Sequence, residues 1–422
     1  MERYSEYKST DIGWLPFMPK HWKLESLRKF LRMVSVKNHP NMPLLSVTRE
    51  NGVIVRNVDS KEENHNFIPE DLSGYKYVEK GDFCINKMKS WQGSYGVSEY
   101  EGIVSPAYYI CKLFGVDRKF FSMAIRSRCY VSFFAQYSKG IRVDQWDLSP
   151  LALKAIPFFL PSLTEQQAIV SYLDIKCSKL DMLVENKEKE ILLLSEMKQR
   201  VIADAVTRGL NPSVKLKATN ITWLPEVPEH WEEKRLSSKF VGDVDVNKGF
   251  VYKHAFKFNY GELVPKNETG DSEEYRDTYI KYSLIKKGDI LINGLNLNYD
   301  FVSQRVACAP NDGIITSAYL VCRPRKGVFY NYYTYLFKAM DGMKLFHGMG
   351  SGIRLTLSFK ELKKQMLPVP PLSEQQTIVS YITERTAKID SLIEKLNKEI
   401  ECIKEYKQRL ISDVVTGQIK VS

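Results

Sequence analysis

The sequence lacks the motifs by which catalytic and metal-binding proteins are usually recognised. Its seven cysteines are scattered and never spaced as Cys-x-x-Cys, and its six histidines form no His-Glu-x-x-His motif. We therefore predict no metal site and interpret the cysteines as buried free thiols. There is also no Gly-x-Ser-x-Gly elbow and no Gly-x-x-x-x-Gly-Lys-Ser/Thr phosphate loop. We recognise no catalytic motif in the sequence.

Long apolar runs are also missing, since no run approaches the ~20 residues needed to cross a bilayer. The polar start Met1–Lys8 does not resemble a signal peptide, so we expect a cytoplasmic protein. The 422 residues are 44% hydrophobic and 26% charged, as in ordinary globular proteins of two or three domains. A net charge of +11 favours a polyanionic partner.

One glycine-rich stretch, Phe346–Gly352, has the composition of a cofactor loop. A dinucleotide-binding loop follows a strand, opens a helix and has an acidic residue about 20 positions later. Here Ile353–Leu357 is typical of a strand after the loop, which favours a flexible or phosphate-contacting loop over a cofactor loop. A methyltransferase with an unusual cofactor loop at Gly348–Gly352 stays an alternative, which measuring S-adenosylmethionine binding to the isolated chain would test.

What is present is a repeat. Leu163–Leu173 recurs as Leu372–Ile382, identical at 8 of 11 positions and displaced by 209 residues. Prolines precede both copies, and a proline cannot extend a helix backwards. Thr164 with Gln167, and Ser373 with Gln376, have the spacing of a capping box. We predict two long helices that stop near Gly209 and Gly417, each of roughly 65–70 Å.

Apolar residues continue along both predicted helices at intervals of three, four and seven, which is typical of a heptad seam. We therefore expect the two helices to bury these stripes against each other as an antiparallel coiled coil. Two independent amphipathic helices, each on its own domain, are the alternative. The predicted seam positions are Ile169, Leu173, Leu180, Val184, Ile191, Leu194, Val201 and Ala205, and then Ile378, Ile382, Ile389, Ile393, Leu396, Ile400, Ile403, Leu410 and Val414.

A second repeat precedes each domain. Ile12–Trp22 recurs as Ile221–Trp231, again displaced by 209 residues and identical at 7 of 11 positions. Its prolines exclude a regular helix, so we predict an extended arm that its tryptophans pin to a domain. We interpret His21 and His230, one in each arm, as packing residues rather than metal ligands or bases.

The intervening regions favour an α+β fold of short strands and turns with some helix. We predict a globular domain at 1–162, a helix at 163–209, a second domain at 210–371 and a helix at 372–422. The two domains are mixed α/β and are separated by the antiparallel helices, with internal pseudo-twofold symmetry. The second helix should end beside the arm at Ile12–Trp22, so that the chain closes on itself.

Together, the two Pro-x-Leu-Thr/Ser-Glu-Gln-Gln helix starts, the paired Trp-Leu-Pro…His-Trp arms and the variable domains between matching frameworks resemble the specificity subunits of Type I restriction–modification systems. The resemblance covers essentially the whole chain. It implies two target recognition domains, each of which reads one half of a split, asymmetric double-stranded DNA site. The helices would then fix the spacer between the half-sites.

The resemblance also implies a subunit without catalytic activity of its own. It would hold two methyltransferase subunits, which carry S-adenosylmethionine, and restriction subunits that add ATP-dependent DNA cleavage. No cofactor is expected on this chain, which has no Asn-Pro-Pro-Tyr or Asp-Pro-Pro-Tyr motif. A protein-binding coiled-coil scaffold with incidental basic charge is the alternative, and titration with duplex DNA would distinguish the two.

Candidate DNA contacts lie where the two frameworks diverge and on the two Ser…Gly-Ile-Arg segments. Basic side chains suit phosphates and guanine, and amides suit adenine edges. The candidates are Lys87, Lys89, Trp91, Gln92, Ser138, Lys139 and Arg142 in the first domain, and Asn293, Asn296, Asn298, Gln304, Arg305, Ser351 and Arg354 in the second.

The repeated helix starts are the candidate docking sites for the methyltransferase subunits. The side chains that we assign to this contact are Leu163, Glu165, Gln166, Gln167, Leu372, Glu374, Gln375 and Gln376.

Overall fold

A computed structural model describes residues 2–58, 68–140, 146–242, 244–266, 274–301, 303–350 and 355–421. The chain forms two compact units. Unit 1 comprises Met1–Lys187 and Asn397–Ser422, and unit 2 comprises Glu188–Leu396. Each unit therefore contains one globular domain together with part of each long helix.

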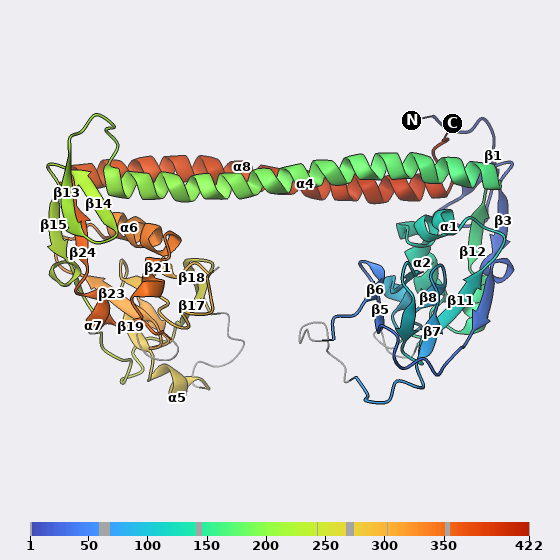
Figure 1. Cartoon of the computed structure of the whole chain (residues 1–422), viewed down its shortest axis with the longest axis horizontal. Helices are drawn as coiled ribbons and strands as arrows, with labels where there is room; N and C mark the ends of the chain where they lie inside the picture. The colour runs from blue at the N-terminus through green and yellow to red at the C-terminus, as the bar shows by residue number, and fades with distance from the viewer. Residues whose placement is uncertain are drawn as a thin grey trace. The chain divides into compact units, whose positions relative to one another are not determined.

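The domain of unit 1 is built from short strands, with three helices after the last strand of its main sheet (Figure 1). The strands are β1 Tyr7–Ser9, β2 Phe17–Pro19, β3 Lys23–Ser26, β4 Leu31–Val34, β5 Leu45–Thr48, β6 Gly52–Val55, β7 Lys76–Val78, β8 Phe83–Ile85, β9 Tyr95–Val97, β10 Gly102–Val104, β11 Tyr109–Leu113 and β12 Pro157–Leu160. The helices are α1 Arg118–Ile125, α2 Arg128–Tyr137 and α3 Pro150–Ala155.

The domain of unit 2 repeats the order of strands. Its strands are β13 Leu216–Ile221, β14 Leu224–Pro228, β15 Glu232–Arg235, β16 Phe240–Val241, β17 Phe256–Asn259, β18 Glu262–Pro265, β19 Ser283–Ile285, β20 Ile290–Ile292, β21 Val306–Cys308, β22 Gly313–Ile315, β23 Leu320–Pro324 and β24 Met366–Val369. Its helices are α5 Arg276–Tyr279, α6 Tyr330–Gly342 and α7 Phe359–Leu362. One of them, α5, precedes β19, whereas the other two follow the last strand of its main sheet.

The strand order is the same in both domains. The main antiparallel sheet runs β4-β11-β8-β9 in unit 1 and β16-β23-β20-β21 in unit 2. All three residues of β8 and all three of β20 are buried, as expected of a central strand that is covered on both faces. The predicted α+β class and the repeated framework are confirmed.

A buried aspartate marks the same turn in each main sheet, directly before the central strand. In unit 1 the Asp82 carboxylate pairs with the Lys112 amino group at 3.0 Å. In unit 2 the Asp289 carboxylate pairs with the Arg323 guanidinium at 2.8 Å. The framework therefore accepts either cation opposite this carboxylate.

The two long helices are α4 Leu163–Arg208 and α8 Leu372–Val415. In unit 1 the Lys407 amino group lies 2.6 Å from the Asp181 carboxylate, and in unit 2 Lys198 lies 2.6 Å from Asp390. A shift of 209 residues converts one pair into the other. The pairing is therefore antiparallel within each unit (Figure 1).

The predicted seam is confirmed, because every seam position is buried or half-buried. Ile169 and Leu173 of α4 share a core with Leu410 and Val414 of α8 in unit 1. In unit 2 Ile202 and Ala205 share a core with Ile378 and Ile382. The alternative of two independent amphipathic helices is wrong.

The predicted capping boxes are wrong. The Glu165 amide donates to the Ser162 hydroxyl at 3.2 Å, so the cap of α4 lies two residues before Thr164. In the second copy the first turn begins at Pro371, whose carbonyl accepts from the Gln375 amide at 2.9 Å. A proline has no hydroxyl, so the second helix has no side-chain cap at that position.

Both predicted helix stops are confirmed. Gly209 and Gly417 have φ of +74°, the left-handed conformation that favours glycine after a helix. The arms pack directly against these positions. A Cβ at Gly209 would lie 3.3 Å from the Trp231 ring, and a Cβ at Gly417 would collide with Pro19.

Candidate nucleic-acid interface

The predicted contacts of unit 1 that the structure describes come together in one cluster. The β8–β9 loop carries Lys87, whose amino group lies 3.0 Å from the Asp147 carboxylate. That hydrogen bond to Asp147 raises the pKa of Lys87. The Ser90 and Ser138 hydroxyls lie 3.4 Å apart, and Lys139 forms a β-bridge with Asp147. Segments about 50 residues apart in sequence therefore form one surface.

The exposure of these side chains separates their roles. Lys89 and Lys139 are exposed, whereas Lys87 and Gln92 are half-buried. Ser138 is buried, and its hydroxyl donates to the Phe134 carbonyl at 2.7 Å. Its placement favours a structural role over the predicted DNA contact.

A second tryptophan joins the unit 1 cluster. Trp91 is half-buried, and its ring centroid lies 5.3 Å from that of Trp146. Sequence reasoning missed Trp146, because its position four residues after Arg142 gave no indication that it would reach the β8–β9 loop. The pair forms the aromatic part of the cluster.

The β20–β21 loop of unit 2 is topologically equivalent. Asn293 and Asn298 are half-buried, Asn296 and Gln304 are exposed, and Asn296 has a φ of +52°. The loop also exposes Tyr299 (78%) and Phe301 (54%), which sequence reasoning missed. The prediction rested on the amides of the loop, whereas these two aromatics are its most exposed large side chains.

The structure places one predicted contact differently. Arg305 is fully buried, and its guanidinium donates to the carbonyls of Asn293 at 2.9 Å, Leu295 at 2.8 Å and Asp300 at 2.6 Å. It supports the loop from beneath and is not placed to contact DNA. The Asp300 carboxylate also lies 3.5 Å from the guanidinium. Local sequence did not distinguish this buried arginine from an exposed one, because its hydrogen bonds are to backbone carbonyls, which any residue type supplies.

Both loops are held at their bases by the same backbone contact. The Leu148 amide donates to the Lys87 carbonyl at 3.1 Å, and the Leu357 amide donates to the Gly294 carbonyl at 2.9 Å. The predicted contacts Arg142, Ser351 and Arg354 lie outside the described residues. The frame around each loop is thus equivalent, whereas the loops differ.

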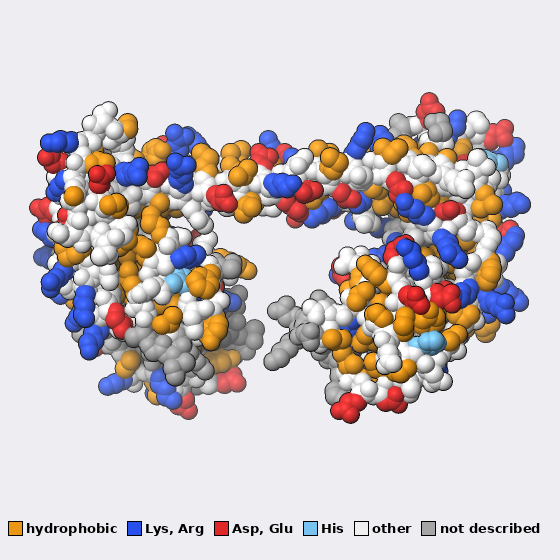
Figure 2. Space-filling model, in the orientation of Figure 1, with side chains coloured by type: hydrophobic (Ala, Val, Ile, Leu, Met, Phe, Trp, Pro, Cys, Tyr) orange, Lys and Arg blue, Asp and Glu red, His pale blue; other side chains and the backbone are white. Residues whose placement is uncertain are grey.

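Two basic side chains that lie over a buried ring of unit 2, and one exposed tyrosine elsewhere in that unit, were also not predicted. The Lys253 amino group lies 5.3 Å and the Arg276 guanidinium carbon 5.1 Å from the centre of the Phe250 ring. Tyr260, on the β17–β18 turn, is 89% exposed. Figure 2 shows Lys and Arg side chains spread over the visible surface of each unit.

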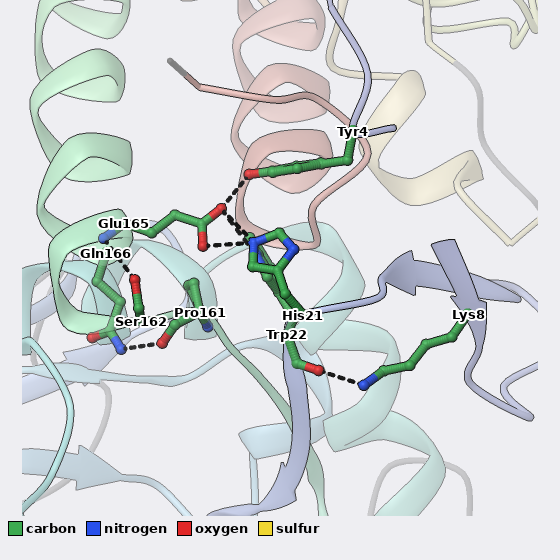
Figure 3. A network of polar contacts seen from close by, with 8 residues as sticks. All are labelled: Tyr4, Lys8, His21, Trp22, Pro161, Ser162, Glu165 and Gln166. Carbon is green, nitrogen blue, oxygen red and sulfur yellow. Dashed lines mark hydrogen bonds and ion pairs between the residues drawn. The ribbon is translucent and has the colours of Figure 1, made fainter. Parts of the chain in front are cut away.

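Each helix start forms a network of polar contacts within its own unit, and Figure 3 shows the network of unit 1. In unit 1 the Glu165 carboxylate accepts from the Tyr4 hydroxyl at 2.6 Å and from the Trp22 indole at 3.0 Å, and it lies 3.1 Å from His21 Nε2. Burial and this contact with Glu165 raise the pKa of Tyr4. Trp22 is fully buried, which confirms that the arm is pinned to its domain.

Unit 2 repeats the contacts of this carboxylate with the histidine and the tryptophan. The Glu374 carboxylate lies 2.7 Å from His230 Nε2 and accepts from the Trp231 indole at 3.1 Å. The next residue is also engaged in both units. The Gln166 amide nitrogen donates to the Pro161 carbonyl at 3.0 Å, and that of Gln375 donates to the Pro370 carbonyl at 2.8 Å.

These contacts change the docking prediction. Gln166 and Gln375 are buried, and Glu165 and Glu374 are half-buried and engaged within their own units, so all four have structural contacts of their own. The other four predicted docking residues, Leu163, Gln167, Leu372 and Gln376, are exposed.

Two negative findings concern the described part of the chain. It holds no group of three or more His, Cys, Asp and Glu side chains that could bind a metal ion. It also contains no helix that combines the length and apolarity needed for a membrane span.

Comparison with known proteins gives one consistent family. Residues 228–402 match the model of the Type I restriction modification DNA specificity domain. A Methanocaldococcus jannaschii protein, provisionally named as the MjaX specificity subunit of a type I restriction enzyme, is 22% identical over 98% of this chain and 97% of its own length. The EcoBI specificity subunit of Escherichia coli is 24% identical over 72% of this chain and 66% of its own length.

A solved structure supports the fold over nearly the whole chain. A chain from work described as "Structural basis underlying complex assembly and conformational transition of the type I R-M system" aligns with a TM-score of 0.65 and 13% identity, over 95% of this chain and 99% of its own. The repeated framework, the paired long helices and these similarities agree: residues 228–402 match the DNA specificity domain of Type I restriction–modification systems, and the chain over nearly its whole length is similar to a specificity subunit of such a system.

Proposed function

We propose that each unit reads one half of a split, asymmetric double-stranded DNA site. One observation carries this proposal: the same framework occurs twice with the same strand order, but the loops between β8 and β9 and between β20 and β21 differ in length and chemistry. Two different reading loops on equivalent frames suit two different half-sites.

The residue types support different contacts in the two units. In unit 1 exposed Lys89 and Lys139, with half-buried Lys87 and Gln92, suit phosphates and base edges. In unit 2 exposed Asn296 and Gln304 suit adenine edges, because an amide can both donate to and accept from that base. The net charge of +11 would add affinity that depends on salt.

The long helices would set the spacer between the half-sites and help to dock two methyltransferase subunits. We propose that Leu163, Gln167, Leu372 and Gln376, which are exposed at the two helix starts, take part in this docking. Methyl transfer would occur on those partners, which would carry S-adenosylmethionine. Restriction subunits would add ATP-dependent cleavage, so this chain would contribute specificity and no catalytic group.

Reconstitution with the partner methyltransferase subunits tests the proposal. Sequencing the methylated adenines should give a motif with two specified parts separated by an unspecified spacer. Exchange of residues 87–92 for the corresponding loop of another specificity subunit should then change one part of the motif only. A motif without two parts, or a chain that does not bind duplex DNA even with its partners, would contradict the proposal.

A further inference from the structure

A half-buried arginine supports the β8–β9 loop of unit 1. Arg126 directly follows α1, and one guanidinium nitrogen donates to the carbonyls of Gly93 and Tyr95, both at 2.9 Å. The other donates to the carbonyls of Arg49 at 2.8 Å and Glu50 at 2.6 Å. Four hydrogen bonds thus tie the end of the β8–β9 loop to the β5–β6 turn.

In unit 2 an arginine at a different position in the chain binds carbonyls of the equivalent loop. Arg305 directly precedes β21, is fully buried, and donates to the carbonyls of Asn293, Leu295 and Asp300. Its own amide donates to the Asp341 carboxylate at 2.7 Å. One side chain therefore binds three carbonyls of the β20–β21 loop, between Asn293 and Asp300.

The chemistry of these contacts selects for arginine. A guanidinium has five N–H donors in a rigid plane and can bind several carbonyls at once, whereas a lysine ammonium has a single nitrogen. Burying a cation costs free energy unless its donors are satisfied. The two terminal nitrogens of Arg305 donate to carbonyls, whereas its buried Nε has no hydrogen-bond partner among the described residues. Arg126 therefore restrains the end of the β8–β9 loop, and Arg305 restrains the segment from Asn293 to Asp300, which includes the left-handed Asn296.

The two loops expose side chains that differ between the units. Lys89 is exposed in unit 1, and Asn296 and Tyr299 are exposed in unit 2. Asn296 lies between Leu295 and Asp300, whose carbonyls Arg305 binds. A change in the position of those carbonyls would therefore move the exposed side chains between them.

We propose that Arg126 and Arg305 are positioning residues, each of which sets the shape of the base-reading loop of its own unit without touching DNA. The proposal includes Asn296 and Tyr299 as side chains that Arg305 presents to one half-site. It rests on the proposed function and adds the residues that tune each half-site separately.

The test uses the full chain assembled with its methyltransferase subunits. Methylation rates are measured on the recognised duplex and on duplexes with single base changes in each half-site. R305K should lower the discrimination at one half-site about tenfold, the size of one lost base contact, and leave the other half-site within about twofold. R126K should affect the opposite half-site.

The chain supplies a matched control. R323K replaces another arginine of unit 2, at a framework position where unit 1 already uses Lys112. This variant should keep the discrimination at both half-sites. Should R305K fail to fold, N296A and Y299A, which change exposed side chains only, should reduce discrimination at one and the same half-site.

The outcomes distinguish this inference from the proposed function. Wild-type protein without a two-part preference would contradict the proposed function itself. Wild-type protein with such a preference, but R305K and R126K variants that lose rate equally on all duplexes with unchanged discrimination, would overturn the positioning role alone. Unchanged discrimination in N296A and Y299A would remove these two residues from the contact.

Discussion

A single carboxylate holds each arm against the start of its long helix. Glu165 receives hydrogen bonds from Tyr4 and Trp22, and Glu374 receives one from Trp231. In sequence a glutamate in the first turn of a helix indicates only a favourable interaction with the helix dipole. The tryptophans predicted a pinned arm, but their partner lies more than 140 residues away and could not be identified from local patterns.

We expect the variant E165Q to lower the free energy of unfolding by about 1–2 kcal/mol, because hydrogen bonds to a charged acceptor exceed those to a neutral one. E374Q should cost less, since Glu374 lacks the contact that Tyr4 makes with Glu165. Urea denaturation measures both. Q167A, which changes an exposed neighbour, is the control, and an effect of E165Q no larger than that of this control would contradict the prediction.

The reactivity of the cysteines should follow their burial. Burial raises the pKa of Cys111 to about 12 and that of Cys129 to about 11, so both stay protonated and unreactive at pH 8. Cys402 is exposed. Titration of the native protein with a thiol reagent at pH 8 should therefore show one fast thiol, which C402S removes; several fast thiols in that variant would contradict the prediction.

The paired lysines of the β8–β9 loop should control affinity and its dependence on salt. Replacing Lys87 and Lys89 together with alanine should weaken DNA binding by the assembled methyltransferase. If both contact phosphates, the slope of log affinity against log salt should fall by about 2. K29A, whose lysine pairs with Glu25, is the control. An unchanged slope in the double variant would remove both lysines from the phosphate contacts.

At the scale of elements, the helices followed from local patterns, whereas their caps and the loop supports did not. The spacing of apolar residues predicts a heptad seam, and a single glycine predicts the end of a helix. Arg305 shows the opposite case. The sequence does not indicate that its guanidinium binds loop carbonyls, because every residue type has a carbonyl and the contact depends on the conformation of the β20–β21 loop.

The seam gives a direct test of the spacer. Inserting one heptad after Lys187 in α4 and one after Leu396 in α8 keeps the apolar register and adds about 10.5 Å to each helix. The assembled enzyme should then prefer a spacer longer by up to about three base pairs, with both half-sites unchanged. Mapping methylated adenines measures this. A heptad in one helix alone should destabilise the protein, and an unchanged spacer with both insertions would contradict the role of the helices.

At the scale of the whole molecule, the chain repeats one pattern twice, and an ion pair can have its acidic and basic residues swapped between equivalent positions of the two units. Glu6 pairs with Lys20 at 2.9 Å in unit 1, whereas the same positions in unit 2 hold Lys215 and Glu229, 3.4 Å apart. The repeat predicted the common frame because it is visible as sequence identity. The loops differ between the halves, so repetition carried no information about their conformation.

The closure of the chain in unit 1 yields the last prediction. The Lys420 amide donates to the Glu2 carbonyl at 2.9 Å, and the Tyr7 hydroxyl donates to the Gly417 carbonyl at 3.0 Å. The two ends of the chain thus lie next to each other at the position that corresponds, in unit 2, to the segment between Gly209 and β13. A chain whose ends are joined by a short linker and which is opened after Leu210 should fold and keep its DNA target, because every helix and strand stays intact. Thermal unfolding and the methylated motif measure both expectations. A chain opened after Lys187 instead cuts α4 and should be strongly destabilised; if both permuted chains were equally unstable, the repeated junction would not be equivalent in the two halves.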